Sequence, residues 1–526
     1  MRLGPNASHP SSEFDYEYGI ALAHLERWNE AHDALEAGRR LRSRDKRFPI
    51  ELAGVAFRQK KNAQAIAYLR QAVRIDSHDA YANDFLASLF FLQGNLEAAV
   101  KYWNCLEKPK PQLRQVRSDP VPRVHPGLLD HAFAFAPAST LTLDELRASE
   151  ARVQALEIFP DYRFDLAALP DSTFDAVFRG REMNGWGATM VEGLVRTFHG
   201  LPFQEITPQY FNLNGTDINM VSTIRWDENK RRLTTEVSGP IGRDPRWRFR
   251  FGTDMRNENW DVVTSFTGPA TLLAALNLRR EAINAEITRL IGARWKWSIS
   301  SELSYRDYRN VVALNTLTPQ LMAQGYLLKQ TAQFGYELWR MPEHRFTVSS
   351  WGSVQAGRVW SQPSEAFERL KALLEVRWLP RSSGDDFDTH WGMRAGKTFG
   401  DIPFDELFML GLERDNDLWM RAHIGTRDGR KGSAPLGRNY FLSNWETDKN
   451  IYSNGLLTLK LGPFVDTGKI TDPTPQLGSR NWLVDTGGQL KLGMLGLSAV
   501  FSYGKDLRTG NNAFYATVSP HAVEAP

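Results

Sequence analysis

From about residue 205 onward, polar and apolar residues alternate with a period of two. Residues 246–251 place an arginine at every second position with an aromatic ring between, and residues 370–378 nearly repeat this pattern. Such alternation is typical of β-strands whose two faces meet different surroundings. No stretch of the chain approaches the about 18 apolar residues of a membrane-spanning helix. The pattern therefore predicts either a half-buried soluble sheet or a barrel that spans a membrane.

The distribution of tryptophan favours the barrel over a tryptophan-rich soluble domain. Of 16 tryptophans, only Trp28 and Trp103 lie in the first third of the chain. Indole rings favour membrane–water interfaces, where one edge of the ring is apolar and the other wet. At about 20 residues for a strand and its connection, residues 205–519 predict one closed transmembrane antiparallel β-barrel of about 16 strands. The rings that we expect to face lipid are Trp247, Phe249 and Phe251.

Residues 13–110 have the periodicity of helices instead. Ala31, Ala65 and Ala98 occupy equivalent positions, separated by 34 and 33 residues. A period near 34 is the signature of tetratricopeptide repeats. Small residues at these positions let the two helices of a repeat pack closely. The sequence therefore predicts an N-terminal all-α, tetratricopeptide-like solenoid.

Solenoids of this kind present a concave groove that binds peptides or partner domains. Arg58 and Asn83 have the phase on the first helix of a pair that would place them in the groove. A solvated surface position is an equal possibility for both residues. We expect a possible partner site around them.

A proline-rich stretch separates the repeats from the next module. Prolines at positions 109, 111, 120, 122 and 126 break helix propagation, and they predict a linker over residues 111–127. Residues 128–182 then predict a small α/β module. Its expected elements are a short strand, a helix and two paired strands, at residues 131–135, 143–158, 162–166 and 173–178.

This module resembles a POTRA domain, the periplasmic module of outer-membrane assembly proteins. The resemblance rests on residues 141–146, 156–159 and 169–171, which precede the expected hairpin. The family uses exposed edges of this module to capture extended polypeptides by β-augmentation, in which backbone hydrogen bonds supply the affinity. The resemblance implies that unfolded or extended polypeptides are the clients.

Residues 205–519 look like the bacterial surface antigen barrel that BamA-type assembly factors share with two-partner secretion translocases. The opening residues 211–232 are similar to the family's first hairpin, and residues 402–411 resemble the approach to its inward-folded loop. The family's inner-wall motif is matched by Phe464-Val465-Asp466-Thr467-Gly468. In the family, the aspartate of this motif receives an arginine from the loop.

The resemblance implies that Arg421 is that arginine, so that Arg421 and Asp466 anchor the loop in the lumen. Met420-Arg421-Ala422-His423 keeps the arginine but lacks the glycine and the aromatic ring that follow it in the family. A planar guanidinium also meets a carboxylate with two parallel hydrogen bonds, and shelter from water reduces screening of the pair. The alternative is that both residues are ordinary charges lining a wet pore.

The residue chemistry indicates neither catalysis nor a bound cofactor or metal. A net charge of +3 is nearly neutral for 526 residues, so we expect no nucleic-acid partner. The only cysteine, Cys105, has no partner for a disulfide or a zinc site. Residues 392–398 resemble a phosphate-binding loop, but three residues separate the glycines where that motif needs four. We expect no enzymatic activity.

These observations predict a protein of the bacterial outer membrane, surrounded by outer-membrane lipid, with its N-terminal region in the periplasm. The expected function is insertion of outer-membrane proteins or translocation of polypeptides, with the repeats recruiting a periplasmic partner or clients. One alternative is a passive or gated pore, and another is a surface barrel with a partner-docking scaffold. The first residues show no apolar segment typical of a signal peptide, which is the observation that fits this interpretation least.

Overall fold

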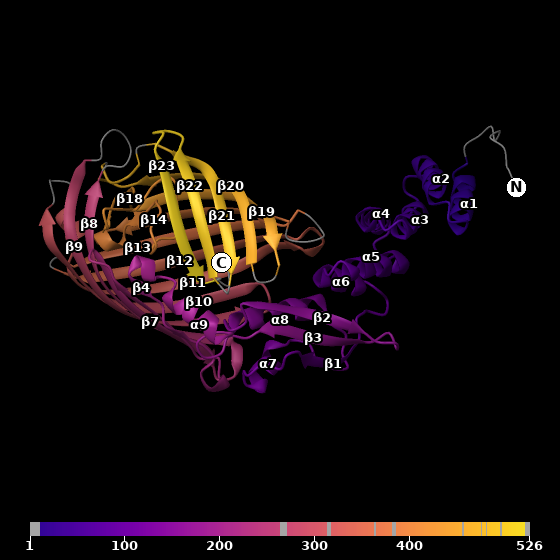
Figure 1. Cartoon of the computed structure of the whole chain (residues 1–526), viewed down its shortest axis with the longest axis horizontal. Helices are drawn as coiled ribbons and strands as arrows, with labels where there is room; N and C mark the ends of the chain where they lie inside the picture. The colour runs from indigo at the N-terminus through magenta and orange to yellow at the C-terminus, as the bar shows by residue number, and fades with distance from the viewer. Residues whose placement is uncertain are drawn as a thin grey trace. The chain divides into compact units, whose positions relative to one another are not determined.

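The computed structural model describes residues 11–520 apart from short gaps at residues 264–270, 313–316, 362–363, 381–385, 455–456, 475, 480 and 495–496. The chain divides into two compact units. The smaller unit holds the helices of the first 117 residues together with segments of the following module, and the larger unit holds the long strands. Figure 1 shows the helical N-terminal part in indigo and the long strands from magenta to yellow.

The described N-terminal residues form three helix–turn–helix pairs: α1 (Ser12–His24), α2 (Trp28–Leu41), α3 (Arg47–Arg58), α4 (Asn62–Ile75), α5 (Ala80–Leu92) and α6 (Leu96–Trp103). Ala31, Ala65 and Ala98 are all fully buried, as the repeat period requires. Side chains set the starts of two helices, because Asp79 accepts from the Ala82 N–H and Asn95 accepts from the Ala98 N–H. An N-terminal helical region is thus confirmed, and its assignment to the tetratricopeptide family stays a prediction.

Glycine is required where the first two helices meet. A Cβ atom on Gly19 of α1 would lie 2.6 Å from Cγ of Leu35 on α2. Leu35 is fully buried, so it has little room to move away. The close approach of α1 and α2 therefore depends on the absence of a side chain at position 19.

The module that follows contains a three-stranded sheet in the order β1-β3-β2, made by β1 (Leu113–Ser118), β2 (Asp161–Ala168) and β3 (Phe174–Arg181). Its helices are α7 (Pro126–Ala132) and α8 (Leu143–Ala155). Strands β2 and β3 and helix α8 lie where the sequence predicts two strands and a helix. The assignment of this module to the POTRA domains stays a prediction.

Two predictions for this region are wrong. The stretch taken as a linker, residues 111–127, contains strand β1, because its prolines flank the strand and leave residues 113–118 uninterrupted. Residues 131–135 are not a strand, since helix α7 ends at Ala132. Pro126 occupies the first turn of α7 and His125 accepts a hydrogen bond from the Gly127 N–H, so the local sequence begins a helix there.

The larger unit is built on antiparallel strands that pair in chain order and curve into a barrel-like sheet (Figure 1). In the described residues this ladder consists of β6 (Asn219–Trp226), β7 (Lys230–Ile241), β8 (Asp244–Val263), β9 (Leu272–Ile291), β10 (Trp295–Val312), β11 (Gly325–Met341), β12 (Phe346–Trp360), β13 (Glu365–Trp378), β14 (Phe387–Gly400), β19 (Asn439–Ser453), β20 (Leu457–Thr471), β21 (Leu483–Met494), β22 (Leu497–Asp506) and β23 (Asn512–Pro520). These described strands are fewer than the roughly 16 expected, because residues 401–438, between β14 and β19, contribute none of them. The strand count of the whole chain stays a prediction. Among the described residues, no helix has the length and apolarity needed to cross a bilayer.

The two faces of this sheet differ in chemistry. On β10, Ile299 is 56% exposed whereas Arg306 is fully buried. On β8, Phe251 is exposed and the neighbouring Arg248 points to the other face, where it pairs with Asp217. Every strand of the ladder carries an exposed apolar side chain, for example Met220, Leu233, Phe251, Ile283, Ile299, Phe334, Val354, Leu370, Trp391, Trp445, Leu461, Met494, Phe501 and Phe514. The outer face is therefore an apolar band, and the inner face carries buried charges.

The edge of the first long strand is covered by two short strands. β4 (Glu205–Ile206) and β5 (Gln209–Tyr210) each pair with β6 through two residue pairs. Helix α9 (Met190–Phe198) comes just before them, and the Thr207 N–H donates to the carbonyl of Thr197 at 2.9 Å. By contrast, β8 and β9 pair along nearly their whole length.

A leucine at position 19 should separate α1 from α2. We expect Gly19→Leu to lower the free energy of unfolding of the helical region by about 1–3 kcal/mol, because the added side chain overfills a packed contact. The measurement is the thermal loss of helical circular dichroism at full chain length. Gly54→Leu is the matched control, since a Cβ atom on Gly54 would meet nothing within 4 Å. Equal loss in both variants would contradict this account of Gly19.

Candidate functional site

Residues 401–438, between β14 and β19, fold back against the inner face of the sheet, and we call them the inward loop. The stretch holds only short elements: η5 (Phe404–Glu406), β15 (Phe408–Met409), β16 (Thr426–Arg427), β17 (Arg430–Lys431) and β18 (Leu436–Gly437). Lys431 of β17 pairs with Trp260 of β8, and Arg421 contacts Asp466 of β20. The inward loop therefore reaches strands that are far apart in the ladder.

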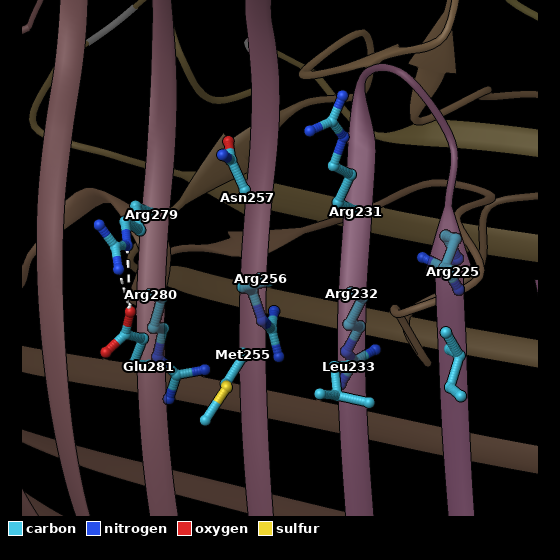
Figure 2. A pocket seen from close by; sticks show the side chains of 11 residues that line it. Arg225, Arg231, Arg232, Leu233, Met255, Arg256, Asn257, Arg279, Arg280 and Glu281 are labelled. Carbon is cyan, nitrogen blue, oxygen red and sulfur yellow. Dashed lines mark hydrogen bonds and ion pairs between the residues drawn. The ribbon is translucent and has the colours of Figure 1, made fainter.

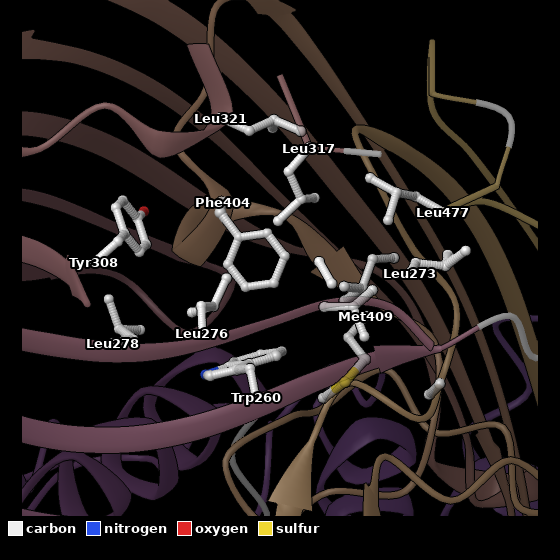
Figure 3. Packing of buried hydrophobic residues seen from close by; sticks show 14 residues of the cluster. Trp260, Leu273, Leu276, Leu278, Tyr308, Leu317, Leu321, Phe404, Met409 and Leu477 are labelled. Atoms are coloured by element: carbon white, nitrogen blue, oxygen red, sulfur yellow. The ribbon is translucent and has the colours of Figure 1, made fainter. Parts of the chain in front are cut away.

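An apolar cluster fixes one end of the inward loop. The ring of Phe404 meets Trp260 of β8 edge to face, with ring centres 5.1 Å apart. Figure 3 shows Phe404 and Met409 among side chains of β8, β9 and β10, including Leu276 and Tyr308. Burial of each large apolar side chain stabilises by about 1.5–3 kcal/mol. This cluster gives the loop an apolar attachment beside its charged ones.

Arg421 makes the most complete set of contacts in the loop. Its Nη2 atom lies 2.7 Å from Oδ1 of Asp466, and its Nε atom donates to Oδ2 at 2.9 Å. Its Nη1 atom donates to Glu446 at 2.7 Å and to Gln489 at 2.9 Å. The guanidinium also lies 3.8 Å from the ring centre of Phe464. Arg421 is only 4% exposed and Asp466 is fully buried, so each charge is compensated out of contact with bulk water.

The spacing of the inner-wall motif follows from strand geometry. Phe464, Asp466 and Gly468 are two residues apart on β20, so all three lie on its inner face. A Cβ atom on Gly468 would lie 3.0 Å from the sulfur of Met420. Phe464 thus places its ring against the guanidinium of Arg421, and Asp466 places its carboxylate beside that guanidinium. Gly468 leaves room for Met420, the residue before Arg421.

His423 makes a second contact of this kind. The Nδ1 atom of His423 lies 3.1 Å from Oδ2 of Asp485, and its Nε2 atom lies 3.7 Å from Asp506. The Ala422 N–H donates to the same Asp485 carboxylate at 2.7 Å. The inward loop therefore has a second anchor, a buried histidine between two aspartates.

Carboxylates of the loop bind basic residues on the opposite part of the ladder. Asp415 lies 2.9 Å from Arg225 of β6 and 3.0 Å from Lys431. Lys431 also pairs with Glu258 of β8 at 2.7 Å. These residues connect the inward loop to the first strands of the ladder.

A third group of charges lies near the start of the loop. Asp405 pairs with the fully buried Arg306 of β10 at 2.9 Å. Glu406 pairs with Lys329 of β11 at 3.1 Å and with Arg369 of β13 at 3.3 Å. Sequence reasoning missed this group and the Asp415 group, because their partners lie tens to hundreds of residues away.

The site consists of paired charges and an apolar cluster. Its charges pair with one another, and the described residues contain no cluster of histidine, cysteine, aspartate or glutamate suited to a metal ion. A hollow of about 290 Å³ lies over β6 to β9 (Figure 2). Its lining mixes the buried Arg225 and Arg280 with the outward Leu233 and Met255, so it belongs to both faces of the sheet and we assign no ligand to it.

The two residues expected in the groove of the helical repeats differ in exposure. Arg58 is exposed at the last position of α3. Asn83 is only 1% exposed, and its Nδ2 atom donates to the carbonyls of Ser77 and Asp79 at 3.0 and 2.8 Å. The prediction that Asn83 faces a partner is therefore wrong, because its amide holds the start of α5.

The Arg421–Asp466 contact can be tested by a double-mutant cycle. We expect Arg421→Ala and Asp466→Ala each to cost about 3–5 kcal/mol of barrel stability, since each leaves a buried charge uncompensated. The double variant should be little worse than either single one. Unfolding by urea in detergent micelles measures all three.

The matched control is a more exposed ion pair between the same loop and β8. Arg430 and Asp261 lie 3.1 Å apart with side chains 46% and 35% exposed. Substituting either by alanine should cost about 1 kcal/mol or less. If the losses at Arg421 and Asp466 simply add, the two residues do not act as a pair.

Comparisons with known proteins give matches only among solved structures. No family model and no curated protein matches the chain. CdiB from Escherichia coli has a TM-score of 0.49 at 12% identity, covering 78% of this chain and 76% of that chain. BamA from Haemophilus ducreyi lacking POTRA domains 1–3 has a TM-score of 0.44 at 10% identity, covering 79% and 86%. CdiB from Acinetobacter baumannii also has a TM-score of 0.44 at 10% identity, covering 88% and 86%.

Proposed function

We propose that the chain is a bacterial outer-membrane barrel that inserts outer-membrane proteins or translocates polypeptides. In this proposal its helical repeats and POTRA-like module lie in the periplasm and recruit partners or clients. The observation that carries the proposal is the division of the sheet into an apolar outer face and an inner face whose charges hold a folded-in loop.

Membrane insertion is supported by the extent of the outer band. Soluble monomers rarely expose a continuous apolar patch larger than a few hundred Å². Here every described strand of the ladder contributes exposed apolar side chains. Lipid tails can cover such a band, whereas exposing it to water would be energetically unfavourable. The barrel then closes in the bilayer, because unpaired strand edges are not tolerated there.

The handling of polypeptides is supported by the edge of β6. Among the described residues, that edge pairs with β4 and β5 through two residue pairs each, and its Ser222 and Trp226 N–H groups donate to the carbonyls of Pro208 and Gln204 beside them. An extended client strand could replace those short pairings by an equal or larger number of backbone hydrogen bonds. Strand exchange of this kind needs no cofactor and no catalytic group, since one set of hydrogen bonds replaces another.

The inward loop bears on the choice between a translocase and a pore. Its charges pair with the inner wall at Asp405, Asp415 and Arg421, so the lumen is occupied along its path. A passive pore needs an open water path, whereas an insertase needs a closed lumen and an exchangeable edge. The proposal therefore places insertion ahead of a passive pore, whereas translocation through the lumen would require the inward loop to move out of it.

Purified full-length protein in lipid vesicles tests the proposal. We expect it to need detergent for extraction, to show heat-modifiable gel mobility, and to speed the folding of a urea-unfolded outer-membrane barrel into those vesicles. Empty vesicles are the control. Steady ion conductance in planar bilayers without any effect on client folding would favour the pore. Solubility without detergent would overturn the membrane assignment.

The proposal that the helical repeats recruit a periplasmic partner can be tested separately. Deleting residues 13–110 should leave heat-modifiable mobility of the barrel intact and abolish copurification of a periplasmic partner. Arg58→Glu should weaken that copurification, because it reverses an exposed charge on the expected groove. Arg44→Glu, an equal charge change at another exposed position, serves as its control. Copurification that survives the deletion would remove the repeats from this role.

A further inference from the structure

Helix α9 has its polarity reversed relative to a helix on the surface of a soluble protein. Its polar residues Glu192, Arg196 and Thr197 are buried against the protein at 2%, 5% and 8% exposure. Its apolar residues point outward, with Leu194 54% and Phe198 45% exposed. A surface helix in water normally buries its apolar stripe and exposes its polar face. α9 therefore has an apolar face directed away from the chain.

The buried polar face of α9 contacts residues outside the helix, which favours this orientation. The Arg196 Nε atom donates to Gln209 of β5 at 3.2 Å, and its guanidinium lies over the ring of Phe211. Glu192 forms ion pairs with Arg196 and Arg181. Turning the helix to hide its apolar side would break the contacts of Glu192 with Arg181 and of Arg196 with Gln209.

More apolar groups continue the exposed face of α9 on both sides. Trp186 precedes the helix and is exposed, and its ring meets Tyr210 of β5 with centres 6.2 Å apart. Leu201, in the turn η1 (Leu201–Phe203), is exposed beyond the end of the helix, whereas the ring of Phe203 lies 3.7 Å from the guanidinium of Arg414 and is not part of this face. A backbone with a side chain at position 193 could not pack this way, because a Cβ atom on Gly193 would lie 2.7 Å from the carbonyl oxygen of Trp186.

This apolar face is continuous with the outer band of the barrel. Tyr210 is paired with Met220 of β6, so their side chains lie on the same face of the sheet. Met220, Ile224 and Trp226 are the exposed residues of β6 on that face. The run from Trp186 through Tyr210 to Met220 therefore joins the α9 region to the surface that the barrel presents to lipid.

We propose that α9 is a membrane-interface helix whose apolar face lies among the acyl chains of the leaflet at the rim of the barrel, beside the edge of β6. This inference rests on the proposed function, since it needs the barrel to be in a bilayer. Amphipathic helices with aromatic and aliphatic residues on one face lie in the plane of the interface in this way. The helix would then hold the segment that covers β6 at the membrane surface.

Lipid contact can be measured on the full chain in vesicles of phosphatidylcholine. A single cysteine is placed at Leu194→Cys in a Cys105→Ser background and labelled with bimane. A lipid carrying a doxyl group near its headgroup should quench this label strongly. The reference label is Phe251→Cys, on the outer band, and the negative control is Arg44→Cys, on the helical repeats.

The pattern of quenching separates the two proposals. Quenching of both the Leu194 and Phe251 labels, to a comparable extent, is the expected result. Quenching at Phe251 alone would overturn the inference about α9 and leave the barrel assignment standing. A Leu194 label shielded from both doxyl lipid and aqueous iodide would also overturn it, since a protein would then cover the helix. Absence of quenching at both positions would refute the membrane assignment itself.

Discussion

The buried contact between Arg421 and Asp466 is the constraint on which the interior of the barrel depends. A guanidinium withdrawn from water must find a counter-charge, because an uncompensated buried ion costs several kcal/mol. That need fixes a carboxylate at position 466, a ring at position 464 and a residue without a side chain at position 468. The position of Arg421 in turn places the middle of the inward loop against β20 and β21.

The other charged groups of the loop repeat this principle with alternating sign. Near its start the loop is acidic and meets basic strands, whereas Arg421, His423 and Lys431 are basic and meet acidic ones. A shift of the loop along the wall would place like charges together, so the pairing defines one register. Buried ion pairs contribute little net stability compared with apolar packing, although breaking one is costly. The charge pairs therefore hold the loop in one position against the wall.

Local patterns in the sequence predict the features that depend on neighbouring residues. The period-two alternation of residues 246–251 predicts the two faces of β8. The pairing of Asp466 with Arg421, 45 residues away, is expected from the resemblance to the bacterial surface antigen barrel. The contacts of Asp405, Glu406 and Asp415 could not be predicted, because they arise only when distant strands are brought together by the ladder. Arg225 and Asp415, for example, are 190 residues apart.

The errors in the sequence predictions have local causes. Asn83 has the helical phase of a groove residue. Its amide instead donates to two carbonyls within six residues of it, and these local hydrogen bonds keep the side chain buried. Prolines at positions 111 and 120 suggest a linker over residues 111–127, but they lie on either side of β1 and do not interrupt it. The reversed polarity of α9 is visible only when the burial of both of its faces is known.

The central claim is that residues 401–438 form part of the interior of the barrel. Hydrogen exchange of their backbone amides, in the full chain held in lipid nanodiscs, tests it most directly. The Leu412 N–H donates to the carbonyl of His423 at 2.7 Å, and the Gly425 N–H donates to Leu412 at 2.8 Å, within a buried segment. The account predicts that amides of residues 408–425 exchange as slowly as those of β20. Exchange as fast as in the hairpin turn at residues 227–229 would contradict it.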